Sequence, residues 1–83
     1  MNKEDKKKRE EFKRNELKKL GKTIQNLSEN LYETQTEFSV AAECTPEYLN
    51  RVMKGKQNPG YVNLIKIADA LNVSLDELRK GKN

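Results

Sequence analysis

The chain has 83 residues, of which 34% are hydrophobic and 36% are charged, and this composition suits one small domain but not two. It contains no histidine and one cysteine, so the usual zinc sites, an intramolecular disulfide and the commonest general base are all missing, and we expect no enzyme, metal, cofactor or small-molecule ligand. The net charge is +4, and neither an apolar run of 18 residues nor a basic-then-apolar amino terminus occurs, which predicts a soluble, cytoplasmic protein without a membrane span or signal peptide.

Positive charge is concentrated at the amino end. Residues 1–20 carry nine basic and five acidic side chains, whereas residues 21–83 carry eight of each. A basic arm over residues 1–16, joined to a domain over residues 17–80, suits a polyanion whose phosphates it would neutralise. A solubilising tail or a helical extension with Glu/Lys pairs fits the same composition, and the sequence leaves these alternatives open. Residues 81–83 are expected to be a disordered tail.

The first two helices are indicated by an apolar stripe and by a cap. Spacings of three and four residues along residues 17–31 predict a helix that begins in the arm and ends near Asn30. Thr34 and Glu37 have the spacing of a capping box, in which each side chain binds the backbone N–H of the other residue. This box predicts a second helix over residues 35–42, with Phe38 turned inward. The stripe of the first helix consists of Leu17, Leu20, Ile24, Leu27 and Leu31.

The segment CTPEYLNRVMKGK predicts a third helix over residues 46–54. Thr45 is a good N-cap, and Pro46 suits the first helical position because its missing N–H costs nothing there. Leu49 and Val52 are spaced for its buried side, and Gly55 can end the helix in the left-handed conformation.

Two further helices complete the prediction. A fourth helix with one apolar face is predicted over residues 61–71. It should end before Asn72, because asparagine tolerates the left-handed conformation. Ser74 and Glu77 form a second capping box, which opens a helix over residues 75–79. No segment alternates with a period of two, so we expect an all-α bundle of five helices. The apolar face of the fourth helix consists of Leu64, Ile65, Ala68 and Leu71.

Residues 20–78 resemble the lambda-repressor-like helix-turn-helix domain of the XRE and Cro/C1 regulators. The segments GKQNP and LIKIADALNVSLDEL carry the most specific part of the resemblance. It implies that the second and third helices bind double-stranded DNA, with the third helix in the major groove. It further implies a transcriptional regulator, expected to be a repressor, that binds an inverted-repeat operator as a homodimer. Candidate dimer surfaces are the fifth helix, with Leu75 and Leu78, and the extended first helix.

The resemblance also implies site residues. Arg51 could donate two hydrogen bonds to guanine, and Glu47 could accept one from cytosine. Glu47 could instead favour the helix N-terminus, Arg51 could pair with Glu47, and the Tyr48 ring could be buried while its hydroxyl reaches a phosphate. The residues expected to read bases are Thr45, Pro46, Glu47, Asn50 and Arg51, and those expected to hold phosphates are Gln35, Tyr48, Lys54 and Lys56.

The chain departs from the family pattern around the proposed interface. Glu43 occupies the turn position where glycine is usual, which costs on the order of 1 kcal/mol if φ is positive. Cys44 matches a buried aliphatic position, so we expect a structural role for it. Glu43 and Glu47 would add carboxylates near DNA, which leaves a protein-interaction module, such as an antirepressor or antitoxin-type subunit, as the alternative function. The other departures are Ser28, Tyr32, Glu33 and Ser39.

Overall fold

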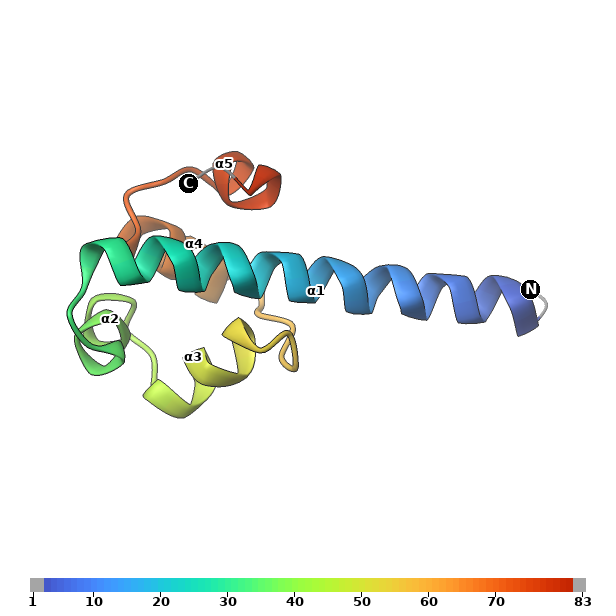
Figure 1. Ribbon diagram of the computed structural model, residues 1–83, viewed down its shortest axis with the longest axis horizontal. Helices are drawn as coiled ribbons and strands as arrows, with labels where there is room; N and C mark the ends of the chain where they lie inside the picture. Colours follow the sequence, from blue (N-terminus) through green and yellow to red (C-terminus); the bar gives the residue numbers. More distant parts are fainter. Residues whose placement is uncertain (1–2, 82–83) are drawn as a thin grey trace.

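Residues 3–81, which the computed structural model describes, form five helices and no strand, as the sequence predicts (Figure 1). Residues 1–2 of the expected arm and 82–83 of the expected tail lie outside this range. None of the helices in the described range has both the length and the apolar character needed to cross a membrane. The helices are α1 (Lys3–Leu31), α2 (Gln35–Ala41), α3 (Pro46–Met53), α4 (Tyr61–Ala70) and α5 (Leu75–Lys80).

Helix α1 runs the length of the molecule, and its amino-terminal part extends well beyond the other four helices (Figure 1). Of the alternatives for the arm, the helical extension is the one observed, and the whole of residues 3–16 is exposed. Ile24 and Leu27 of the predicted stripe are buried, and Leu17 and Leu20 are half-buried. Leu31 belongs to the same predicted stripe but is 48% exposed, because α1 ends at this residue.

The core lies where the carboxyl-terminal half of α1 meets the four shorter helices. Phe38, Leu49, Val52 and Leu78 bring α2, α3 and α5 into this core. In α4, Ile67 is fully buried although it was not part of the predicted apolar face, whereas Leu64 and Ile65 are only half-buried. The buried stripe of α4 therefore lies further towards its carboxyl end than predicted. The buried apolar residues are Ile24, Leu27, Phe38, Ala42, Leu49, Val52, Ile67, Ala68, Ala70, Leu71 and Leu78.

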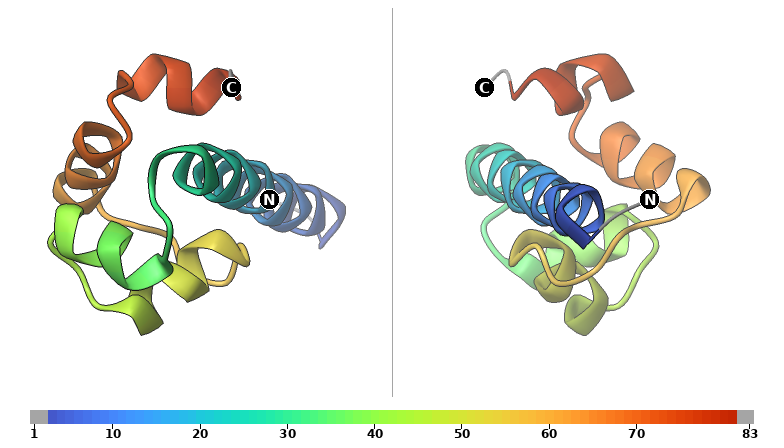
Figure 2. Two further views of the ribbon diagram at one scale, coloured as in Figure 1. Left: turned by 60° about the vertical axis from the view of Figure 1, so that its left-hand side comes forward. Right: turned by 90° about the vertical axis from the view of Figure 1, so that its right-hand side faces the viewer.

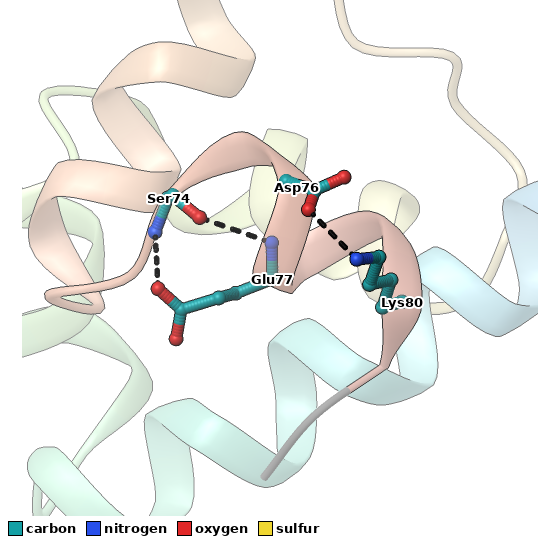
Figure 3. A network of polar contacts seen from close by, with 4 residues as sticks. All are labelled: Ser74, Asp76, Glu77 and Lys80. Atoms are coloured by element: carbon teal, nitrogen blue, oxygen red, sulfur yellow. Dashed lines mark hydrogen bonds and ion pairs between the residues drawn. The ribbon is translucent and has the colours of Figure 1, made fainter.

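The two predicted capping boxes form to different extents. At α5 the box is complete: Glu77 N donates to Ser74 Oγ over 3.1 Å, and Ser74 N donates to Glu77 Oε1 over 3.3 Å (Figure 3). At α2 the Glu37 N–H donates to Thr34 Oγ1 over 3.1 Å. The reciprocal bond to the Glu37 carboxylate does not form among residues 3–81, so this prediction is half wrong. Its carboxylate remains exposed at the first turn of α2.

Tyr32, another of the departures from the family pattern, joins α1, α2 and α4 at the neck of the fold. Its ring stacks on Phe38 with centroids 5.5 Å apart, and its hydroxyl donates to the Ala70 carbonyl over 2.6 Å. Two other departures from the family pattern satisfy their own hydroxyls locally. Ser28 donates to the Gln25 carbonyl and Ser39 to the Thr36 carbonyl. These polar substitutions therefore leave no unpaired hydroxyl in the interior.

Candidate nucleic-acid interface

The turn between α2 and α3 is held by backbone hydrogen bonds and contains a strained residue. Glu43 has φ 55°, which confirms that it takes the left-handed conformation without the freedom of glycine. The N–H groups of Glu43 and Cys44 donate to the carbonyls of Val40 and Ser39 over 3.1 and 3.0 Å. The Glu43 carboxylate lies 4.0 Å from Lys66 Nζ of α4, so that cation offsets part of its charge.

Helix α3 has one buried and one exposed side. Leu49 and Val52 are 0% and 1% exposed and fix the helix to the core. Glu47, Arg51 and Lys54 follow one another at spacings of four and three, and all three are exposed on the side away from Leu49 and Val52. Neither the Glu47 nor the Arg51 side chain forms an ion pair within residues 3–81. The positive charge of Arg51 is therefore not neutralised by a neighbouring carboxylate.

The amino end of α3 is tied to α2. Thr45 caps the helix by accepting from Tyr48 N over 3.1 Å, with Pro46 in the first turn. Gln35, at the start of α2, donates from Nε2 to the Pro46 carbonyl over 3.0 Å. This bond places an exposed amide beside the first turn of α3. The first turns of the two helices thus form one polar surface.

The carboxyl end of α3 turns back on itself and brings a second lysine to the interface. Gly55 has φ 74°, and its N–H donates to the Val52 carbonyl over 3.0 Å. The Lys56 N–H donates to the Arg51 carbonyl over 2.9 Å, which is the six-to-one bond of a Schellman cap. Lys54 and Lys56 are both exposed on either side of this glycine. The geometry therefore adds two cations directly after Arg51.

Helix α1 touches this end of α3 through its only glycine. A Cβ on Gly21 would lie 2.5 Å from the Val52 carbonyl oxygen and would also collide with the Met53 carbonyl. Gly55 is similarly close to Lys18, whose Cγ would be 2.9 Å from an added Cβ. Gly21 was not among the predicted site residues, although an isolated glycine within a helical pattern is a known sign of close packing.

Tyr48 faces α4. Its ring packs against the core, and its hydroxyl accepts a hydrogen bond from Asn63 Nδ2 over 3.0 Å. Because Asn63 is the donor, the hydroxyl proton of Tyr48 remains available to a further acceptor. Asn63 and Lys66 are supporting residues of α4 that the sequence analysis did not identify, since their partners lie far away in the sequence.

Cys44 is half-buried, and its Sγ lies 3.4 Å from the Ala42 carbonyl, which fits the expected structural role. Burial raises the pKa of the Cys44 thiol above its ordinary value, and the positive charge of Lys66 offsets part of this rise. A raised pKa keeps the thiol protonated, so the cysteine is a poor nucleophile at neutral pH.

The structure brings most of the predicted site residues to one surface. Thr45, Glu47 and Arg51 are exposed, and Pro46 and Asn50 are half-buried beside them. Gln35, Lys54 and Lys56 lie exposed at the two ends of α3, as described above. Tyr48 is set apart, because its side chain is directed towards α4.

Comparisons with known proteins agree with this arrangement. The helix-turn-helix family model matches residues 34–78, which is more than half of the chain. No curated protein sequence matches. The structure is similar to the restriction-modification controller protein C.AhdI from Aeromonas hydrophila, with a TM-score of 0.71 and 27% identity over 75% of this chain and 94% of that chain. The chain therefore belongs to the helix-turn-helix family, as a DNA-binding transcription regulator of the XRE type.

Proposed function

We propose that the protein is a sequence-specific repressor that places α3 in the major groove of double-stranded DNA and binds an inverted-repeat operator as a homodimer. The observation that carries the proposal is the exposed side of α3, where Glu47, Arg51 and Lys54 share one face. A helix of this width fits the major groove, which presents a distinct hydrogen-bonding pattern for each base pair. A restriction-modification controller of similar structure supports a regulatory role.

Bases and phosphates are assigned to different residues of the interface. Arg51 reads guanine through two hydrogen bonds, and Glu47 accepts from cytosine N4, with Thr45, Pro46 and Asn50 completing the base-reading surface. Phosphate contacts carry affinity but little sequence information, and they come from the ends of α3. The residues proposed for phosphates are Gln35, Tyr48, Lys54 and Lys56.

The test is selection from a randomised pool of duplexes at two salt concentrations. A single inverted-repeat motif should be enriched, and Arg51→Ala should cost about 1–3 kcal/mol and relax selectivity at one position in each half-site. Lys56→Ala should weaken all sequences alike and lower the salt slope by about one unit. Lys80→Ala is the matched control, because Lys80 lies on α5 and should leave both quantities unchanged. A pool without any enriched motif and without salt dependence would contradict the proposal.

The exposed Glu47 favours the protein-interaction module as the second candidate function. An unpaired carboxylate on the proposed DNA face repels phosphates wherever it does not accept a hydrogen bond from a cytosine. Under this second candidate, Glu47→Gln should raise DNA affinity evenly for all sequences. Under the main proposal the same change should lower affinity for the selected operator only. Glu47→Gln should therefore raise operator affinity under the second candidate and lower it under the main proposal, and one titration of the operator distinguishes the two.

We assign the arm over residues 1–16 to DNA affinity and the domain over residues 17–80 to sequence choice. The exposed cations of the arm continue α1 past the end of α3 that carries Lys54 and Lys56. Removing residues 1–11, which leaves Phe12 in place, should therefore weaken binding to all duplexes without changing the selected motif. Unchanged affinity would contradict a contribution of the arm to DNA binding.

A further inference from the structure

Helix α1 carries an exposed stripe that neither the core nor the DNA interface uses. Phe12, Glu16, Lys19 and Thr23 follow one another at spacings of four, three and four, so they lie on one face. The first three are exposed, whereas Thr23 is buried at the end of the stripe, close to Gly81. Gly21, which contacts α3, points to the opposite side of the helix. Phe12 is 64% exposed and is the only apolar residue in residues 3–16.

Two hollows open along this stripe. One is a groove of about 570 Å³ between α1 and α5, with Thr23 and Gly81 among its lining residues. The other is a groove of about 290 Å³ whose lining is mostly apolar, formed by leucines of α1, α4 and α5. Glu16 and Lys19 border both grooves. The ribbon in Figure 2 shows α5 on one side of α1 and α3 on another. The leucines are Leu17, Leu20, Leu64, Leu75 and Leu78.

We infer that this surface binds a second copy of the chain, with the two α1 helices antiparallel. Two residue pairs of the stripe share one midpoint along the sequence, between Leu17 and Lys18. The pairs are Phe12 with Thr23 and Glu16 with Lys19. A two-fold axis through this point places Glu16 of each copy opposite Lys19 of the other. It also places each Phe12 ring opposite Thr23 of the other copy, at the groove between α1 and α5.

Glu16 and Lys19 favour a second copy as the occupant, and the other charged residues of the groove between α1 and α5 are Lys22, Arg79 and Lys80. Each copy offers one carboxylate and one ammonium group in the stripe, and the two-fold axis pairs them twice. Such a contact is self-complementary, as the interfaces of symmetric dimers are. The neighbouring apolar groove then loses contact with water, which adds hydrophobic stabilisation. This inference rests on the proposed homodimer, since it names the surface through which the dimer forms.

Charge exchange between Glu16 and Lys19 tests the pairing, because both side chains are exposed and their replacement should not unfold the domain. Glu16→Lys and Lys19→Glu should each raise the dimer dissociation constant at least about ten-fold in sedimentation equilibrium. The double variant E16K/K19E should restore it, since every pair re-forms with reversed polarity. Phe12→Ala should also raise the dimer dissociation constant, and the charge exchange E16K/K19E should not reverse this loss. Glu11→Lys makes the same charge change on another face of α1 and should have no effect.

A distance measurement tests the antiparallel geometry. Spin labels at position 3, introduced as Lys3→Cys together with Cys44→Ser, should be roughly 45 Å apart, from the rise of 1.5 Å per residue. A clearly shorter distance, or single exchanges that leave the dimer intact, would overturn this inference while leaving operator binding untouched. Single exchanges that weaken the dimer without rescue in the double variant would also overturn it. A chain that is monomeric on its operator would contradict the proposed homodimer as well.

Discussion

The contact between Gly21 and the end of α3 makes Gly21→Ala a sharp test of the structure. Intrinsic helix propensity favours this change, because alanine stabilises a helix interior by about 1 kcal/mol relative to glycine. The structure predicts the opposite sign. The new Cβ would lie 2.5 Å from the Val52 carbonyl oxygen, and essentially no Cβ approaches a neighbouring atom closer than 3.0 Å.

The size of the effect follows from this geometry. The colliding atoms belong to the backbone of α3, so no side-chain rotation relieves the clash and the two helices must separate by about half an ångström. Overpacking of this kind costs about 1–3 kcal/mol, which exceeds the gain in propensity for most of that range. We expect a net loss of about 1 kcal/mol, which lowers the melting temperature by roughly 4–8 °C in a domain of this size.

Thermal unfolding followed by circular dichroism measures this change. Asn26→Ala, at an exposed position of α1, is the matched control and should raise stability by a few tenths of a kcal/mol. The separation of the helices also displaces Lys54 and Lys56, so operator affinity should fall more than stability alone explains. A Gly21→Ala protein that melts at or above the temperature of the original chain would refute the reasoning.

Three further predictions concern the turn, Tyr48 and Cys44. Glu43→Gly should stabilise the fold by about 1 kcal/mol in urea unfolding, since glycine adopts the positive φ freely, whereas Glu43→Ala should give no gain. Tyr48→Phe removes the acceptor of Asn63 and should cost about 1 kcal/mol; a loss of DNA affinity with an unchanged salt slope would support its phosphate role. Cys44 should react with a disulfide reagent at pH 8 more slowly than in the unfolded chain, because its pKa is raised, and the two rates should converge at higher pH. Its raised pKa also makes stability fall as the pH rises through the alkaline range, and a rising stability there would contradict the assignment.

Local chemistry made most of the fold predictable. The caps at Thr45 and Ser74, the glycine stop at Gly55 and the left-handed Asn72 are all found as predicted, because each depends on residues close in sequence. Helix ends differ by about one residue, as is usual for frayed termini. Ile67 escaped prediction because the burial of α4 depends on which neighbours surround it, and spacing alone does not specify them.

The candidate site was predictable in its residue types but not in its supporting contacts. Exposure of Glu47, Arg51, Lys54 and Lys56 follows from the burial of Leu49 and Val52 on the other side of α3. The orientation of Tyr48 depends on Asn63, fifteen residues later, and that of Glu43 depends on Lys66. Such contacts arise from tertiary packing, to which single-sequence patterns are insensitive.

The uninterrupted α1 has a mechanical consequence for the DNA-binding helix. Gly21 and Lys18 rest against the end of α3, while the same rigid helix continues to Lys3 without support from the rest of the fold. The arm is therefore a rigid extension of the same helix that contacts the end of α3 beside Lys54 and Lys56. The end of the arm at Lys3 lies about 22 Å along the helix axis from Lys18, so any tilt of α1 at its contact with α3 is magnified at the end of the arm.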